Sequence, residues 1–265
     1  MSITERTTRT PRGEMAWSEA GAGWPVMLLH AFPLNATMWR PQLEAVPAGW
    51  RFIAPDLRGF GRGPAADRPG TMEDYAADIC ALMDSLELDT ATIGGLSMGG
   101  YAAFAIHRAQ PARLARLVLA DTRATADTPQ GREGRVAMRE LLAGKGPAGV
   151  AAQMLPKLLS PAAGSKTIAL VREMIESASA GGIDAAIGAL MSRPDSTPQL
   201  ERIACATLVV VGDADALTPP ADSEAMHQAI PRSTLTVIPG AGHLSNLEQP
   251  AAFSRALQDF LLSAL

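Results

Sequence analysis

Residues 91–100 read Ala-Thr-Ile-Gly-Gly-Leu-Ser-Met-Gly-Gly, and they say more about the fold than any other stretch of this chain. An apolar, β-prone run leads into the pattern Gly-x-Ser-x-Gly, and a helical pattern starts at Tyr101. Strand, sharp turn and helix form the context in which this pattern presents a reactive serine. Side chains at the flanking positions would clash in so sharp a turn, so we expect Gly95 and Gly99 to be required there. The sequence therefore predicts Ser97 as a candidate nucleophile at the end of a strand.

Strands and helices alternate along most of the chain. Short apolar runs are typical of buried strands. Such runs occur at residues 26–30, 51–56, 90–95, 114–121, 206–212 and 233–238. A hairpin is predicted over residues 7–18 and a helix over residues 72–86. This alternation predicts an α/β fold with a mostly parallel, doubly wound sheet. Ligands bind beyond the carboxyl ends of the strands in such sheets, and Ser97 is expected at that edge.

Residues 123–203 interrupt this alternation, because they contain helical patterns and no convincing strand. Helices are predicted at residues 132–142, 149–159, 166–178 and 183–191, with a fifth near 199–203. We therefore expect a core domain built from residues 1–122 and 204–265. Residues 123–203 are expected to form a helical lid, or cap, over the sheet edge that carries Ser97.

Composition excludes several classes of function. The chain has 265 residues and a net charge of −4, with no run of Lys or Arg, so nucleic acid is not an expected partner. It has no apolar signal core and no run of about 18 apolar residues, which predicts a cytoplasmic protein without membrane contact. Cys80 and Cys205 are expected to be reduced. We expect no cofactor and no metal, and the sequence leaves monomer and homodimer open.

A serine nucleophile needs a general base within hydrogen-bond reach. His243 lies in a Gly-rich loop directly after the last predicted strand, which places it at the same sheet edge as Ser97. His107 and His227 fall in predicted helices and are interpreted as packing or solvated residues. His30 ends a strand and is interpreted as a structural residue that binds neighbouring loops.

The base needs an acid, and the developing oxyanion needs hydrogen-bond donors. Asp213 and Asp215 both follow the strand that ends at residue 212, and the residues alone do not decide between them. The backbone N–H of Met98, directly after the serine, is one predicted oxyanion donor. The backbone N–H of Phe32, in the loop after the strand that ends at residue 30, is the other.

Five segments together resemble the α/β-hydrolase superfamily over nearly the whole chain. They are His-Ala-Phe-Pro at 30–33, Pro-Asp-Leu-Arg-Gly-Phe-Gly at 55–61, the serine motif at 95–100, Gly-Asp-Ala-Asp-Ala-Leu-Thr-Pro at 212–219 and Gly-His-Leu-Ser-Asn-Leu-Glu-Gln-Pro at 242–250. The resemblance implies a triad in the chain order Ser97, Asp215, His243. It makes Asp213 a variable position and Asp121, after the strand before the lid, a further alternative acid. Ala31 departs from the family, in which Gly is commoner.

Within the superfamily the chain resembles small carboxylesterases and 3-oxoadipate enol-lactonases. The function this implies is a serine hydrolase of carboxylic esters with small to medium acyl groups, acting through an acyl-enzyme. The alternatives are a lactonase, a perhydrolase, a C–C bond hydrolase and a non-catalytic, receptor-like member. The lid is expected to be apolar, with few fixed charges. Its Met and Leu side chains either line the pocket or pack the lid helices. Arg132, Arg135 and Arg139 have a spacing that fits a solvated helix face as well as a carboxylate site.

Overall fold

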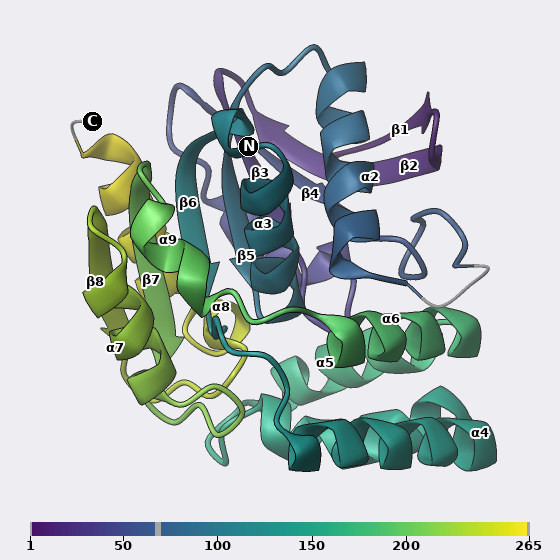
Figure 1. Cartoon of the computed structure of the whole chain (residues 1–265). Helices are drawn as coiled ribbons and strands as arrows, with labels where there is room; N and C mark the ends of the chain where they lie inside the picture. The colour runs from purple at the N-terminus through teal and green to yellow at the C-terminus, as the bar shows by residue number, and fades with distance from the viewer. Residues whose placement is uncertain (1, 67–69, 264–265) are drawn as a thin grey trace.

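The computed structural model describes residues 2–66 and 70–263. Within these residues, eight strands form one sheet in the order β1-β2-β4-β3-β5-β6-β7-β8 (Figure 1). β2 is antiparallel to β1 and to β4, and all other neighbours are parallel. The strands are β1 (Thr4–Thr10), β2 (Gly13–Gly21), β3 (Trp24–Leu29), β4 (Trp50–Pro55), β5 (Ala91–Leu96), β6 (Leu114–Ala120), β7 (Ala206–Gly212) and β8 (Ser233–Ile238). The predicted α/β sheet is confirmed.

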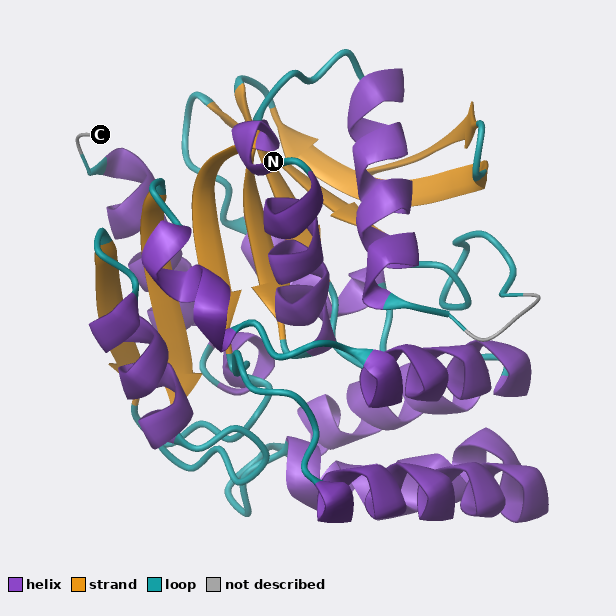
Figure 2. Cartoon of the chain, viewed as in Figure 1, coloured by secondary structure: helices purple, strands orange, loops and turns teal. Residues whose placement is uncertain are grey.

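Helices cover both faces of the sheet (Figure 2). In this view α2, α3 and α7 lie in front of the sheet, and α9 lies behind it in contact with α1. The α-helices are α1 (Arg40–Glu44), α2 (Met72–Ser85), α3 (Met98–Ala109), α4 (Pro129–Leu158), α5 (Ser165–Ser177), α6 (Ala180–Ser192), α7 (Pro220–Ala229), α8 (Ser245–Glu248) and α9 (Pro250–Leu262). The short 3₁₀ helices are η1 (Ala36–Trp39), η2 (Pro111–Arg113) and η3 (Thr197–Arg202).

The crevice lies where the chain leaves two adjacent strands in opposite directions. β3 and β5 are parallel neighbours. The chain continues from β3 towards α1 behind the sheet, and from β5 into α3 in front of it. Loops that diverge in this way leave a crevice at the carboxyl ends of the strands, where ligands bind in this class of sheet. Every residue of β5 is buried, so the strand that ends next to Ser97 is anchored on both faces.

The helices between β6 and β7 lie beneath the carboxyl ends of the strands (Figure 1). The two helices predicted at 132–142 and 149–159 both lie within α4, where the non-helical backbone of Gly146 (φ +62°, ψ −168°) separates them at a kink. Pro147 follows directly and starts the second half, since proline is tolerated in a first helical turn. We call residues 123–203 the lid segment. Its assignment as a separate cap domain stays a prediction.

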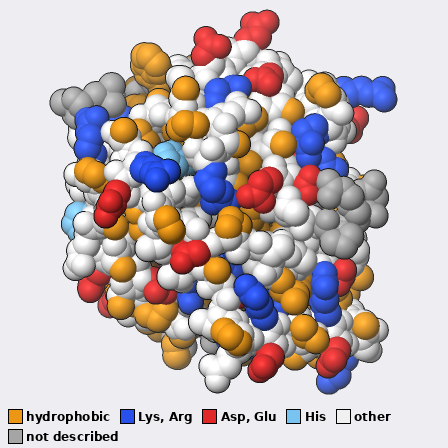
Figure 3. All heavy atoms as spheres, in the orientation of Figure 1, with side chains coloured by type: hydrophobic (Ala, Val, Ile, Leu, Met, Phe, Trp, Pro, Cys, Tyr) orange, Lys and Arg blue, Asp and Glu red, His pale blue; other side chains and the backbone are white. Residues whose placement is uncertain are grey.

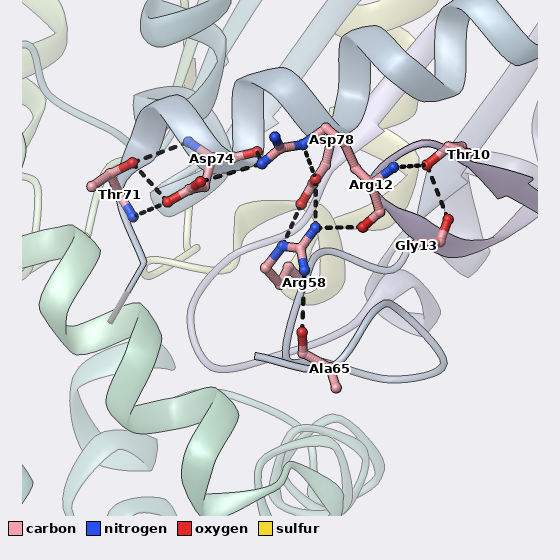
Figure 4. A network of polar contacts seen from close by, with 8 residues as sticks. All are labelled: Thr10, Arg12, Gly13, Arg58, Ala65, Thr71, Asp74 and Asp78. Carbon is pink, nitrogen blue, oxygen red and sulfur yellow. Dashed lines mark hydrogen bonds and ion pairs between the residues drawn. The ribbon is translucent and has the colours of Figure 1, made fainter. Parts of the chain in front are cut away.

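The lid segment rests on the loop that follows β4. α6 approaches this loop so closely that a Cβ atom on Gly182 would lie 1.9 Å from the carbonyl oxygen of Gly59. An ionic network holds the same loop on its other side (Figure 4). Asp78 of α2 is fully buried and accepts hydrogen bonds from Arg12, in the β1–β2 turn, at 2.6 Å and from Arg58, after β4, at 2.7 Å. This network therefore holds the loop after β4 in place, and α6 packs against that loop.

Among the residues that the structure describes, no helix is long and apolar enough to cross a membrane.

Candidate active site

Ser97 occupies a strained turn between β5 and α3. Its backbone has φ 55° and ψ −110°, a combination that costs on the order of 1–3 kcal/mol for a residue with a side chain. A Cβ atom on Gly95 would lie 2.1 Å from the backbone of Gly99, and one on Gly99 would lie 2.2 Å from the carbonyl oxygen of Leu29. The turn therefore requires glycine at both positions. The hydroxyl of Thr122 secures it by donating a hydrogen bond to the Ser97 carbonyl at 2.9 Å.

The structure brings Ser97, His243 and Asp215 together. The Ser97 Oγ lies 2.8 Å from His243 Nε2, and His243 Nδ1 lies 2.8 Å from Asp215 Oδ2. An ionised carboxylate only accepts hydrogen bonds, so Nδ1 carries the proton and Nε2 is left to accept the serine hydroxyl. The side chains of His243 and Asp215 are 3% and 0% exposed, so water does not compete for these bonds.

A tight turn after β7 holds the Asp215 carboxylate. Its Oδ1 accepts the backbone N–H groups of Leu217 at 2.8 Å and Thr218 at 3.0 Å, and its Oδ2 accepts the Thr218 hydroxyl at 2.6 Å. Burial alone would raise the pKa of Asp215, but the hydrogen bond and charge of His243, together with Thr218, hold it below its usual value. Sequence reasoning missed Thr218, although aspartate side chains commonly accept backbone N–H groups of the residues that follow them in such turns.

The two alternative acids lie in different surroundings. Asp213 is exposed and accepts the backbone N–H of Gly240 at 2.8 Å. Asp121 is fully buried, and it accepts the Gly212 N–H at 2.9 Å and the Ser245 hydroxyl at 2.5 Å. Burial, with the nearby carboxylate of Asp215, raises the pKa of Asp121 well above its usual range. Of the three candidates, Asp215 is the one hydrogen-bonded to His243.

The other histidines do not contact Ser97. His30 is fully buried, with Nδ1 3.0 Å from the Ala31 carbonyl and Nε2 accepting the Leu57 N–H at 3.0 Å, as expected for a residue that binds neighbouring loops. Burial lowers the pKa of His30 to about 4. His107 is buried in α3. His227 is only half-buried, but it is not simply solvated, since its Nδ1 lies 2.8 Å from the Ser233 hydroxyl.

Glu248 fixes the loop that carries His243. Its two carboxylate oxygens accept the backbone N–H of Gly242 at 2.8 Å and that of Ser160 at 2.9 Å. Ser160 follows α4, so one side chain joins the His243 loop to the end of a lid helix. Sequence reasoning missed this role. The sequence signal for this role is weak, because a glutamate five residues after a histidine occurs in many other structural contexts.

The predicted oxyanion donors lie beside the serine. Met98 is the first residue of α3, where backbone N–H groups have no partner within the helix. Phe32 lines the same pocket as Ser97 and His243. Within the described part of the chain, the Phe32 N–H donates no hydrogen bond. Both groups are therefore available to an oxygen bound next to Ser97, and their role stays a prediction.

A pocket of about 340 Å³ opens next to Ser97, between the core and the lid segment. Met138, Met154 and Leu158 line it, whereas Leu142 and Met174 are buried away from it. The expectation of few fixed charges is wrong, because Asp127 and four cationic side chains also line the pocket. The lining cations are Arg123, Arg135, Lys157 and Arg193. They come from segments too far apart in sequence for any one helical pattern to reveal them.

The three lid arginines differ from one another. Arg132 is exposed, Arg135 lines the pocket, and Arg139 pairs with Asp184 at 2.8 Å. Within residues 2–66 and 70–263, no group of His, Cys, Asp and Glu side chains is arranged to hold a metal ion.

Comparisons with known proteins agree with this fold. A family model described as the alpha/beta hydrolase fold matches residues 25–250. A thermophilic esterase from Thermogutta terrifontis, solved with malate bound, has a TM-score of 0.92 and 41% identity, over 97% of this chain and 98% of its own. The enol-lactonase from Burkholderia xenovorans has a TM-score of 0.89 and 25% identity, over 97% of this chain and 100% of its own. A 3-oxoadipate enol-lactonase from Acinetobacter baylyi is 31% identical over 229 residues, covering 85% of this chain and 84% of its own. This chain belongs to the α/β-hydrolase family and is a hydrolase of the ester and lactone type.

Proposed function

We propose that the protein hydrolyses carboxylic esters of small to medium acyl groups, with Ser97 as nucleophile, His243 as base and Asp215 as the acid that orients the base. One observation carries this proposal: the hydrogen-bonded chain from the Ser97 hydroxyl through both ring nitrogens of His243 to Asp215, with 2.8 Å at each end. This arrangement supplies the general base that a serine nucleophile requires.

The reaction proceeds in two halves. Ser97 attacks the carbonyl carbon while His243 takes its proton, and the backbone N–H groups of Met98 and Phe32 stabilise the oxyanion. The tetrahedral intermediate breaks its bond to the alcohol, which leaves with the proton from His243. A water molecule, deprotonated by His243, then attacks the acyl-enzyme. The bond between the acyl carbon and the Ser97 oxygen breaks, His243 returns the proton to that oxygen, and the acid is released.

A lactone is the second candidate substrate, because two of the similar proteins are named enol-lactonases. The chemistry of the serine is the same, but the alcohol stays attached to the acyl group after the ring opens. The pocket of about 340 Å³ then has to hold both ends of one molecule at once.

A rate panel tests the proposal. The purified protein is assayed on p-nitrophenyl esters from acetate to octanoate, on simple lactones and on one enol-lactone, with Ser97→Ala as the blank. We expect hydrolysis that depends on Ser97 and is fastest on short esters. A much higher rate on a lactone would move the assignment to lactonase. Inactivity on the whole panel would overturn the proposal in favour of a C–C bond hydrolase, a perhydrolase or a receptor-like member.

A further inference from the structure

The pocket next to Ser97 carries an excess of positive charge. Among the described residues that line it, Asp127 is the one carboxylate, against the four cations Arg123, Arg135, Lys157 and Arg193. The chain as a whole has a net charge of −4. On the face shown in Figure 3, Lys and Arg side chains are interspersed with Asp and Glu. The excess is therefore a local property of the pocket.

The acidic groups do not neutralise this cluster. Asp127 is shared, since it pairs with Arg193 at 2.7 Å and with Arg135 at 3.2 Å. Arg123 pairs with Asp222 at 3.4 Å, a longer contact. Two carboxylates thus face four cations. Charge of one sign in a cleft with low-dielectric walls attracts ligands of the opposite sign.

Burial of the charged Arg193 side chain costs free energy. Its side chain is 4% exposed, and its guanidinium lies 4.3 Å from the centre of the Tyr101 ring. Two of its nitrogens donate to the carbonyl groups of Leu190 at 2.9 Å and Thr125 at 3.1 Å. Its Nε is buried and has no hydrogen-bond partner among the described residues. A buried donor without a partner costs on the order of 1–3 kcal/mol, so its place in the lining needs a reason beyond packing.

Lys157 is the lining cation that is free to bind a ligand. Within residues 2–66 and 70–263 its ammonium group makes no hydrogen bond or ion pair. Its backbone, in contrast, is fixed near the base. The next residue, Leu158, accepts the backbone N–H of Leu244 at 3.2 Å, and Leu244 directly follows His243. Lys157 is exposed to solvent at the rim of the pocket, so its long side chain can extend from this fixed backbone to a group bound beside the base.

We propose that the pocket selects esters or lactones that carry a second, ionised carboxylate, and that Lys157 is the residue that binds it. The arginines around Asp127 supply a supporting positive field, while the methionine and leucine side chains contact the carbon chain of the substrate. This inference rests on the proposed function, because it names the substrate class of the same site. An apolar ester would leave the cationic cluster facing hydrocarbon, whereas a carboxylate neutralises it.

A matched pair of substrates tests the inference. p-Nitrophenyl glutarate, the anionic half-ester, and p-nitrophenyl pentanoate, its neutral counterpart, have five-carbon acyl chains and the same leaving group. Lys157→Met removes the charge and keeps the length of the side chain. We expect about a fivefold loss of kcat/KM on the half-ester, through KM, and little change on the pentanoate. Lys157→Glu should lower the half-ester rate further, and added salt should reduce the difference between the two substrates.

Lys166→Met is the matched control, because Lys166 is an exposed lysine of α5 that does not line the pocket. It should leave the ratio of the two rates unchanged. The inference is overturned if Lys157→Met leaves the ratio at its wild-type value, or if Lys166→Met lowers it equally.

A binding measurement separates this inference from the proposed function. Glutarate is titrated calorimetrically into the Ser97→Ala protein, with and without Lys157→Met. We expect weaker binding when Lys157 is replaced. Equal affinity, or no binding to either protein, would contradict the carboxylate site. A wild-type protein that binds glutarate through Lys157 yet hydrolyses no ester would retain this site and refute the esterase proposal.

Discussion

The sheet edge that carries the serine and the lid segment that covers it are built in different ways. At the edge, backbone geometry places each group. The turn at Ser97 admits only glycine on either side, and backbone N–H groups bind the Asp215 carboxylate. Glu248 holds the loop that carries His243. In the lid segment, side chains from separate helices and loops meet at the pocket, and no single backbone feature places them.

This difference teaches where each property of the protein resides. A reaction mechanism needs a few groups within a few tenths of an ångström of fixed positions, and rigid strand ends provide them. Substrate choice needs only complementary shape and charge, which side chains on several helices can supply. We therefore expect substitutions at the edge to change rate constants greatly. Substitutions in the lid segment should change the relative rates on different substrates by much smaller factors.

The sharpest test of the edge is Ser97→Ala. Loss of the nucleophile is expected to lower kcat by about 10⁶-fold. The small remaining rate would come from the oxyanion donors and from substrate binding. Alanine at this position can keep the strained turn, because it differs from serine only by the hydroxyl, so the melting temperature should change little. Rates on p-nitrophenyl esters and a thermal melt measure both quantities.

Ser192→Ala is the matched control, because Ser192 is an exposed serine at the end of α6. It should keep the wild-type rate. Activity above a few per cent in Ser97→Ala, at a normal melting temperature, would rule out Ser97 as the nucleophile.

The next largest effect separates the two aspartates that follow β7. Asp215→Asn is expected to lower kcat by about 10⁴-fold, because an amide at this position favours the wrong tautomer of His243. Asp213→Asn should stay near the wild-type rate, since an amide oxygen also accepts the Gly240 N–H. Steady-state rates of the two variants on one ester decide the point. The reverse order of effects would assign the acid to Asp213.

The same contrast explains how far the sequence could be interpreted. The turn that carries Ser97 is a local pattern, and so is the loop that carries His243. In each short run, glycine stands where the backbone needs a conformation or a close approach that other residues disfavour. The choice of Asp215 over Asp213 needed family resemblance, because the two side chains differ by their direction after the same strand. The sequence indicated one of the four pocket cations, Arg135, and left its role open between a solvated helix face and a carboxylate site. Lys157 and Arg193 lie in different helical segments, and only tertiary packing brings them to one cavity.

Glu248 tests whether the edge and the lid segment are coupled. Glu248→Ala removes two charge-assisted hydrogen bonds, to the backbones of Gly242 and Ser160, and frees the His243 loop from the end of α4. We expect kcat/KM to fall by about 100-fold and the protein to melt a few degrees lower, because each such bond is worth about 1.5–3 kcal/mol. Glu224→Ala, at an exposed position of α7, is the control. A Glu248→Ala protein with wild-type kinetics would show that the loop positions His243 without the hydrogen bonds of Glu248.

The smallest expected effect concerns His30, whose Nδ1 lies 3.0 Å from the carbonyl oxygen of Ala31, directly before the predicted oxyanion donor Phe32. Burial lowers the pKa of His30 from 6.5 to about 4. Between these two pH values, His30 is protonated in the unfolded chain and neutral in the native protein. Stability is therefore lost as the pH falls, and His30 should account for about 2 kcal/mol of this loss between pH 7 and pH 5. Urea unfolding of the wild type and of His30→Gln at both pH values measures it. The glutamine oxygen can still accept the Leu57 N–H, and every other group titrates alike in both proteins and cancels in the difference.

His227→Gln, at a half-buried histidine, is the control. Equal losses in the wild type and His30→Gln would mean that His30 is protonated as easily in the native protein as in the unfolded chain. The loop that carries Phe32 would then be much less rigid than the rest of this edge.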